Sequence, residues 1–343
     1  MNTSDFDYQL LPEKIAQTPL VNRDDSRLMV ISTSEEHIEH RHFHEISSLL
    51  QSGDILVFND SRVIPARLWG TREGGGKVEI LLLRHINGGL WECLTKPAKR
   101  VSQGKRIRIS DRKGDFSWVE IVEKREEGVV LLDFSNVPHL ENIGEIPLPP
   151  YIHAPLEDPE RYQTVYARVR GSVAAPTAGL HFTPRTLETL KEKNVDFAFV
   201  TLHVGLGSFR PVRDECLQEH RMHQEYGEIP ENTAQKLNIA RAEGRRIICV
   251  GTTTVRLLED VALKTRNNGN VSAFKGWINL FILPGFTFQV TNALLTNFHL
   301  PKSTLLMLVS AFAGSDLIQR AYEEARISDY RFYSFGDAML ILS

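Results

Sequence analysis

The chain has 343 residues, of which 42% are hydrophobic and 24% charged, and its formal net charge is −3 at pH 7. This composition is typical of a globular protein with one large or two ordinary domains, and it excludes a disordered or fibrous chain. No apolar run reaches the roughly 18 residues of a membrane-spanning helix, and the acidic, polar start lacks a signal-peptide pattern, so we expect a cytoplasmic protein.

The first sixty residues end in an apolar, strand-like run, GDILVFND (53–60). Between residues 65 and 135, short apolar runs alternate with tight, glycine-containing turns, which predicts a small β-barrel or sandwich. The runs are KVEILLLR (77–84), LWECLTK (90–96), KRIRI (105–109), WVEIVEK (118–124) and GVVLLDF (128–134). Prolines in the segment IPLPPYIHAPLEDPERY (146–162) then mark a stiff linker.

After the linker, predicted helices alternate with apolar strands. Thr183 and Pro184 are the residue types of an N-cap and a first helical position, and Gly244 is placed to end a second helix. This alternation predicts an α/β domain with a mostly parallel sheet, whose ligands bind at the carboxyl ends of the strands. The predicted boundaries are 1–64 and 150–343 for the α/β domain and 65–149 for an inserted small β-barrel domain.

Five loops at strand ends or helix starts carry polar residues that a core would not need. They are FNDSR (58–62), GSVAAPTAGLHFT (171–183), TLHVGLGS (201–208), VGTTTVR (250–256) and TNFHLPKST (296–304). Three of them contain His181, His203 and His299, and each of these histidines alone has an equally good explanation as a structural residue. Three such loops in one domain favour a shared site, where imidazoles with an unperturbed pKa of about 6.5 can transfer protons.

The threonine turn has a direct physical use. Thr252, Thr253 and Thr254 stand at a predicted helix start, where free N–H groups and the helix dipole bind an anion, although ordinary capping explains a single threonine there. The glycines have neither Walker nor dinucleotide-binding spacing, which favours a carboxylate or a single phosphate as the ligand.

Two histidine-rich stretches and three scattered cysteines carry side chains of the types that bind metals. HIEHRHFHE (37–45) alternates and is charged, which favours a solvated hairpin face. His220 and His223 would share a face if their segment were helical, and we favour a polar site wall over a metal pair there. Cys93, Cys216 and Cys249 are odd in number and suggest neither a disulfide framework nor a thiolate zinc site.

The charge is unevenly distributed. From Arg62 to Lys113 there are 13 Lys or Arg against 4 Asp or Glu, a local net charge of +9. Such an excess suits a surface that binds a polyanion such as a nucleic acid, because each cation near a phosphate releases a counterion. A solvated strand surface without a partner is the alternative.

Taken together, eight strings resemble the S-adenosylmethionine:tRNA ribosyltransferase-isomerase family of queuosine biosynthesis. They are LVFNDSRVIPARL (56–68), YQTVYA (162–167), GSVAAPTAGLHFT (171–183), FVTLHVGLGSFRPV (199–212), HRMHQEY (220–226), VGTTTVRLLE (250–259), LLTNFHLPKSTLLMLVSAFAG (294–314) and YRFYSFGDAMLI (330–341). The resemblance is colinear from DFDYQLLPEKIAQTP near the start to the last predicted strand, and it is weakest within 70–140 and 37–44.

The resemblance implies an α/β fold with an inserted barrel and an uncommon use of S-adenosylmethionine as a co-substrate. Its ribosyl part is transferred to 7-aminomethyl-7-deazaguanine (preQ1) at the wobble position of tRNAs with a G-U-N anticodon, and is isomerised to give epoxyqueuosine. Adenine and methionine are released. The resemblance implies no metal and no second cofactor, and neither a membrane nor an obligate protein partner is expected.

The residues are then assigned as follows. Proton transfer is assigned to His181, His203 and His299, with Asp60 as a carboxylate alternative. The residues assigned to S-adenosylmethionine and the base are Arg62, Thr177, Ala178, Gly179, Gly205, Thr252, Thr253, Thr254, Arg256 and Asn297. The residues assigned to tRNA phosphates are Lys96, Lys99, Arg100, Lys105, Arg106 and Arg108.

Three other classes of function stay open at this point. A methyltransferase would need an acidic, glycine-rich loop after its first strand, which is missing. A noncatalytic RNA-binding protein would explain the +9 segment but not the polar loops of the other domain. A metal hydrolase would need the His220 and His223 pair to bind zinc.

Overall fold

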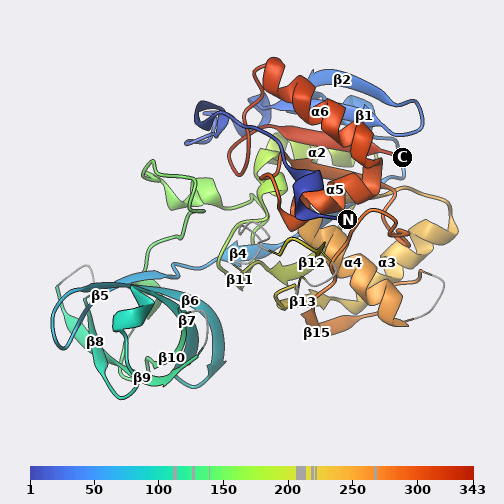
Figure 1. Cartoon of the computed structure of the whole chain (residues 1–343). Coiled ribbons are helices and arrows are strands. Elements are labelled where there is room, and N and C mark those ends of the chain that lie inside the picture. The colour runs from blue at the N-terminus through green and yellow to red at the C-terminus, as the bar shows by residue number, and fades with distance from the viewer. Residues whose placement is uncertain are drawn as a thin grey trace. The chain divides into compact units, whose positions relative to one another are not determined.

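The computed structural model describes residues 1–110, 114–125, 128–138, 140–205, 214–217, 220, 222–265 and 269–343 (Figure 1). Contacts divide the chain into two compact units. The α/β unit comprises Met1–Arg62, Pro149–Val169 and Ala175–Ser343, and the barrel unit comprises Val63–Leu148 and Arg170–Ala174. The sequence prediction of an insertion at 65–149 did not include the short return of the chain at Arg170–Ala174.

A nine-stranded sheet forms the centre of the described α/β unit, in the order β15-β13-β12-β3-β14-β16-β17-β1-β2. The strands are β1 Arg27–Ser32, β2 His37–His42, β3 Ile55–Asn59, β12 Asp196–His203, β13 Glu225–Ile229, β14 Ile247–Val250, β15 Phe274–Ile278, β16 Ala293–Asn297 and β17 Ala338–Leu342. The central strands β12, β3, β14 and β16 are mutually parallel, as are β1 and β17, whereas the other ladders are antiparallel. The predicted α/β class is confirmed, and the four central strands end along one edge.

Helices cover both faces of this sheet. They are α1 Ile46–Leu49, α2 Pro184–Glu192, α3 Glu231–Ala242, α4 Thr252–Thr265, α5 Thr304–Ala313 and α6 Ser315–Ile327. Met29 and Ile31 of β1 belong to the core formed with α3 to α6, whereas Leu28 and Val30 belong to the core formed with α1 and α2. Strands buried on both faces are apolar throughout, which is why their sequences do not alternate.

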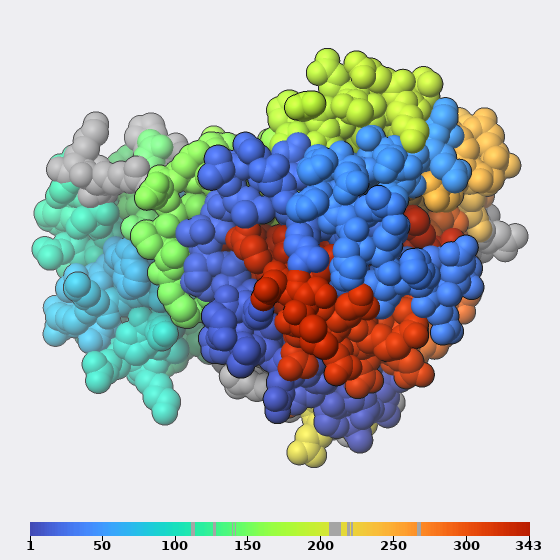
Figure 2. All heavy atoms as spheres, turned by 90° about the horizontal axis from the view of Figure 1, so that it is seen from above, coloured from blue at the N-terminus to red at the C-terminus, as the bar shows by residue number. Residues whose placement is uncertain are grey.

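The two ends of the chain lie side by side. β1 pairs in parallel with β17, Ile15 forms a bridge with Phe332, and Tyr8 packs edge-on against Tyr322. In Figure 2 the N-terminal residues accordingly lie directly beside the red C-terminal residues. The loop that precedes β17 is therefore held in place by the start of the chain, and it reaches the pocket described below.

The predicted start of one helix and the predicted end of another are confirmed. The side chain of Thr183 accepts a hydrogen bond from the Thr186 amide at 3.1 Å and Pro184 is the first residue of α2. Gly244, at φ 70°, follows the end of α3.

None of the helices built from described residues is long and apolar enough to cross a membrane.

The barrel unit is a closed barrel in the order β10-β7-β6-β5-β8-β9. Its strands are β5 Arg67–Arg72, β6 Lys77–Asn87, β7 Leu90–Lys96, β8 Arg106–Ser110, β9 Phe116–Lys124 and β10 Val129–Asp133. Ile107 and Ile109 face the interior and Arg106 and Arg108 face solvent, as the strand period of two requires. The predicted barrel is confirmed, with β5 as a strand that the sequence had not singled out. A separate ribbon pairs β4 Ser61–Val63 with β11 Val169–Ser172.

Candidate active site

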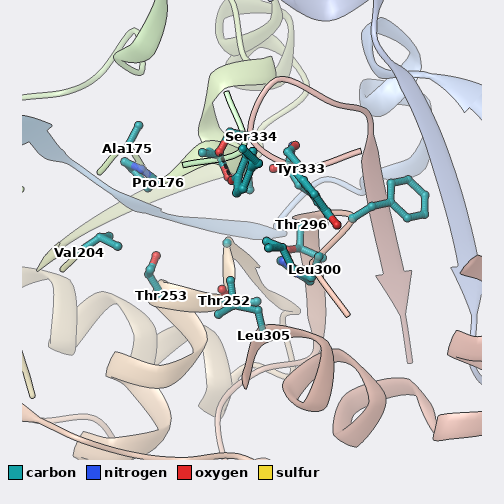
Figure 3. A pocket seen from close by; sticks show the side chains of 17 residues that line it. Ala175, Pro176, Val204, Thr252, Thr253, Thr296, Leu300, Leu305, Tyr333 and Ser334 are labelled. Atoms are coloured by element: carbon teal, nitrogen blue, oxygen red, sulfur yellow. Dashed lines mark hydrogen bonds between the residues drawn. The ribbon is translucent and has the colours of Figure 1, made fainter. Parts of the chain in front are cut away.

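A pocket lies in the α/β unit at the carboxyl ends of β14 and β16. The space between its walls, counted together with open solvent at its mouth, is about 550 Å³. Its wall is formed by residues 175–178, Val204 after β12, residues 251–253, residues 296–300, and the pair Tyr333 and Ser334, with Tyr151 and Leu305 between them. Thr252 and Thr253 project from the start of α4, and Tyr333 and Ser334 lie on the opposite side (Figure 3). The predicted loops therefore meet at this edge, but not with all their side chains.

The small residues 175–178 form one wall and lead into a short 3-10 helix, Thr177–His181. Thr177 and Ala178, both assigned to ligand binding from the sequence, line the pocket, and Gly179 does not. A Cβ atom on Gly179 would lie 2.0 Å from the hydroxyl oxygen of Tyr166. The close packing of Tyr166 on its backbone therefore favours glycine at 179.

The start of α4 forms another wall. Gly251 turns the chain from β14 into α4 at φ 93°, which favours glycine. Thr252 and Thr253 line the pocket, whereas the Thr254 hydroxyl donates to the Val250 carbonyl at 2.8 Å and is used inside the helix. The pocket therefore faces a helix N-terminus with two hydroxyl groups, an arrangement that binds an anionic group.

Arg256, expected beside this anion site, is held elsewhere. Its guanidinium forms a buried ion pair with Glu225 of β13, and its Nε donates to the Leu280 carbonyl at 3.1 Å. Glu225 Oε1 also accepts from the Gly205 amide at 3.2 Å. Neither Arg256 nor Gly205 lines the pocket. The pair instead ties α4 to β13 and to the start of the loop after β12, whose residues 206–213 lie outside the described part of the chain.

His299 is the one predicted catalytic histidine that lines the pocket. Its Nε2 lies 2.9 Å from the Thr296 hydroxyl, and its Nδ1 has no hydrogen-bond partner among the described residues. Burial lowers the pKa of His299 from 6.5 to about 3, because desolvation penalises the charged ring. When the ring proton is on Nε2 and is donated to Thr296, the open Nδ1 can accept a proton from a bound molecule.

His181 lies behind the wall. Its Nδ1 is 2.7 Å from the Ser26 hydroxyl, its Nε2 is 3.2 Å from the Asn297 amide nitrogen, and its ring stacks on Phe43 at 5.1 Å. Burial, with a smaller effect of the positive charges of Arg331 and Arg23, lowers the pKa of His181 to about 3. His181 therefore reaches the pocket only through Asn297, which lines it.

His203 and Asp60 form a second cluster, at the ends of β12 and β3. His203 Nδ1 lies 2.8 Å from the Ser61 hydroxyl, and burial lowers the pKa of His203 while the charge of Asp60 opposes this shift. The Asp60 carboxylate accepts from the Thr201 hydroxyl at 2.6 Å and from Arg168 at 2.7 Å.

Neither His203 nor Asp60 lines the pocket, nor does Arg62, which pairs with Glu160. Of the three histidines, His299 lines this pocket, His181 reaches it through Asn297, and His203 lies along the same edge of the sheet.

Sequence reasoning missed part of the wall. The rings of Tyr151 and Tyr333 are in contact at a tilt of 55°, with centroids 4.8 Å apart, and the Tyr151 hydroxyl lies 2.7 Å from that of Ser334. Tyr333 has φ 71°, an uncommon backbone conformation for a residue with a side chain. Its motif, YRFYSFGD, is part of one of the strings that carry the family resemblance, but no local pattern predicts that this loop lines the pocket.

A family model described as a queuosine biosynthesis protein matches residues 3–341. The chain belongs to the queuosine biosynthesis protein family. It is 50% identical to a protein of Dehalococcoides mccartyi strain CBDB1 and 53% identical to one of Carboxydothermus hydrogenoformans strain Z-2901, in each case over 100% of both chains. Both relatives bear the name S-adenosylmethionine:tRNA ribosyltransferase-isomerase.

A solved structure supports the same kinship. The crystal structure of an S-adenosylmethionine tRNA ribosyltransferase from Thermotoga maritima is 40% identical, with a TM-score of 0.57, over 99% of this chain and 100% of that one. The resemblance inferred from the motifs is thereby confirmed.

The two histidine-rich stretches of this family member lie apart from the pocket. β2 forms an exposed hairpin with β1, which confirms the solvated face. The helix that would have placed His220 and His223 on one face is wrong, because residues 222–224 are irregular and lead into β13. His220 instead bonds Asp214 at 2.8 Å. In the described ranges, no group of three or more metal-ligating side chains converges.

The six barrel cations assigned to tRNA are all exposed. Arg106 pairs with Glu73 at 2.8 Å and lies over the ring of Trp118, and Arg108 lies over Phe116. Within the described residues, the other four form no ion pair. Those four are Lys96, Lys99, Arg100 and Lys105. Their charges are therefore available to a polyanion.

Proposed function

We propose that the chain is an S-adenosylmethionine:tRNA ribosyltransferase-isomerase. It transfers the ribosyl part of S-adenosylmethionine to the aminomethyl group of 7-aminomethyl-7-deazaguanine at the wobble position of G-U-N tRNAs. The ribosyl group is rearranged to the epoxycyclopentanediol of epoxyqueuosine, and adenine and methionine leave. S-adenosylmethionine is consumed as a co-substrate, and the proposal includes no resident cofactor, metal or protein partner. Because its substrate is tRNA, the reaction belongs to the cytoplasm.

The pocket at the carboxyl edge is the observation that carries this proposal, in a chain related end to end to proteins of that name. The N-terminus of α4, with Thr252 and Thr253, suits the methionine carboxylate. The small residues 175–178 leave room for a planar base against their backbone. One anion-binding end and one flat wall thus match the carboxylate and the base of S-adenosylmethionine in chemical character.

The reaction also requires proton transfers. The positive sulfonium acidifies the protons of the adjacent C5′ carbon, so a base must stand near that carbon, and the departing adenine needs a proton. His299 is placed for these steps, because it lines the pocket and one of its ring nitrogens is open to a bound molecule. The barrel cations bind phosphates of the anticodon arm, and the wobble base leaves its stack to react.

The decisive experiment is incubation with S-adenosylmethionine and an anticodon stem-loop carrying 7-aminomethyl-7-deazaguanine, followed by mass analysis of the RNA and the small molecules. The expected products are epoxyqueuosine RNA, adenine and methionine in equal amounts. A matched stem-loop with guanine at that position should give none. Transfer of a methyl group with release of S-adenosylhomocysteine, or RNA binding without any product, would overturn the proposal.

A further inference from the structure

Asn297 connects the pocket to a chain of hydrogen bonds behind it. It is the last residue of β16, lines the pocket and is 2% exposed. Its amide nitrogen Nδ2 lies 3.1 Å from the Tyr333 carbonyl and 3.2 Å from His181 Nε2. Its carbonyl oxygen Oδ1 is buried and has no hydrogen-bond partner in the described part of the chain. A buried acceptor left unpaired costs about 1–3 kcal/mol and calls for an explanation.

The partners of Asn297 determine which way its amide points. A backbone carbonyl can only accept, so the group that faces Tyr333 must be the NH2 of Asn297. The second N–H of that group then points at His181 Nε2, which must carry a lone pair. The proton of the His181 ring is therefore on Nδ1 and is donated to the Ser26 hydroxyl at 2.7 Å. Ser26 in turn donates to the Arg23 carbonyl at 3.2 Å.

The hydrogen bonds of His181 therefore run in one direction, because Nε2 accepts from Asn297 and Nδ1 donates to Ser26. A proton added to Nε2 would face the NH2 of Asn297, and turning the amide over would oppose its oxygen to the Tyr333 carbonyl. The backbone of Tyr333 is itself held in place: it has φ 71°, and its N–H donates to the Phe298 carbonyl at 3.2 Å. The low pKa of His181 agrees with this arrangement.

We propose that His181 is a positioning residue that orients the Asn297 amide, so that Asn297 Oδ1 accepts a hydrogen bond from an N–H or O–H group of the bound substrate. This inference rests on the proposed function and revises the proton-transfer role assigned to His181 from the sequence. The donor is on the nucleoside of S-adenosylmethionine or on the substrate base of the RNA. In either case Asn297 selects a substrate by its donor, and His181 acts only through Asn297.

The state of His181 can be measured without turnover. Long-range nitrogen–proton NMR of the full chain labelled with ¹⁵N-histidine should show His181, identified by comparison with His181→Gln, as the Nδ1–H tautomer from pH 6 to 8. An imidazolium or the Nε2–H tautomer in that range would overturn the proposal. This readout does not depend on the proposed reaction, so the two can fail separately.

Binding locates the donor. Asn297→Ala should weaken either S-adenosylmethionine alone or the modified stem-loop alone by about tenfold to a hundredfold in calorimetry. The first result places the donor on the nucleoside and the second on the base. The matched control is Asn238→Ala, since the Asn238 amide is saturated by the backbone of Val271 at 2.8 and 2.9 Å away from the pocket. Unchanged affinity for both ligands would overturn the role of Asn297.

Turnover separates positioning from proton transfer. His181→Gln and His181→Asn keep an acceptor for Asn297 but cannot transfer a proton near neutral pH. The turnover rate of at least one of them should therefore stay within about tenfold of the wild-type rate, with the same dependence on pH. His181→Ala should lose more, and the double variant His181→Ala with Asn297→Ala should be no slower than Asn297→Ala. If both folded amide variants are as slow as His181→Ala, or the double variant is slower still, His181 acts directly and the proposal is wrong.

Discussion

The α/β unit and the barrel unit place their ionisable groups in opposite ways. The α/β unit buries charged and titratable side chains such as Asp60, Glu225, Arg256, Glu259 and His299. In the described part of the barrel unit, the buried polar residues are only Thr95 and Ser172, and the cations lie on the outside. One unit therefore holds charged and titratable groups within a mainly apolar core, and the other has an apolar interior with a charged surface.

This difference indicates which unit suits catalysis and which suits the binding of a polyanion. A buried charge is tolerated only when hydrogen bonds satisfy it, as for Glu259, whose carboxylate accepts from the amides of Gln289, Val290 and Thr291 at 2.7–3.1 Å. Groups held so firmly keep their geometry when a substrate arrives, which favours catalysis. Exposed lysines and arginines are not held in this way, and they suit the phosphates of a long polyanion.

The largest effect should follow from changing the interior of the α/β unit at the pocket. His299→Gln removes the one pocket-lining imidazole, and we expect turnover to fall by roughly a hundredfold to ten-thousandfold, the usual contribution of a positioned acid or base. Adenine release measures it. His40→Gln, on the exposed hairpin where the imidazole bonds Glu324 and Tyr330, is the control and should keep full turnover. A folded His299→Gln variant within a few-fold of wild type would remove His299 from the chemistry.

A change in the buried ion pair should affect stability more than chemistry. Glu225→Gln leaves Arg256 buried without a matching charge, and we expect the free energy of unfolding to fall by about 3–5 kcal/mol in a urea titration. The exposed pair of Lys14 and Asp329 is the control, and Asp329→Asn should leave that free energy nearly unchanged. Equal effects of the two variants would mean that the interior of the α/β unit does not behave as a low-dielectric region.

Much of this architecture follows from local pattern. The short runs between 65 and 135, the Thr183–Pro184 helix start and the apolar strands each depend on neighbours within a few residues, and all are as predicted. The meeting of several loops at one edge also follows, because parallel strands end on the same side.

The identity of the pocket-lining side chains does not follow from local pattern. Arg256 follows the threonine turn, where a ligand-binding residue is expected. Its guanidinium instead pairs with Glu225, which lies 31 residues earlier in the sequence. Asp60 is likewise saturated by Thr201 and Arg168, and Tyr333 enters the pocket from the last loop. Whether a polar side chain is free depends on partners remote in sequence, and spacing carries no information about them.

Acid should destabilise the α/β unit through its neutral imidazoles. His181 and His299 have pKa values of about 3, below the ordinary 6.5 of the unfolded chain, so the unfolded state binds their protons first as the pH falls. Their stabilisation is complete above pH 6.5 and declines towards pH 3, by about 1.4 kcal/mol per pH unit for each ring. In urea titrations, the free energy of unfolding should fall less between pH 7.0 and pH 5.5 for His181→Gln and for His299→Gln than for the wild type.

The range above the ordinary pKa supplies the control for this prediction. Between pH 7.0 and 8.5 both rings are neutral in the folded and unfolded states, so the differences between the variants and the wild type should stay constant. If the variants lose as much stability as the wild type between pH 7.0 and 5.5, the two rings are already protonated in the folded protein.

The smallest effects should come from single charges on the barrel. Lys99→Ala and Lys105→Ala each remove one exposed cation, and each should weaken tRNA binding a few-fold while lowering the slope of log affinity against log salt by about one. Turnover at saturating RNA should not change, since no interior group is touched. Lys275→Ala, an exposed lysine of the α/β unit that pairs with Glu228 at 3.2 Å, is the matched control and should leave the slope unchanged. An equal change of slope for Lys275→Ala would place phosphate contacts on both units, and an unchanged slope for both barrel variants would leave the barrel cations without a role in RNA binding.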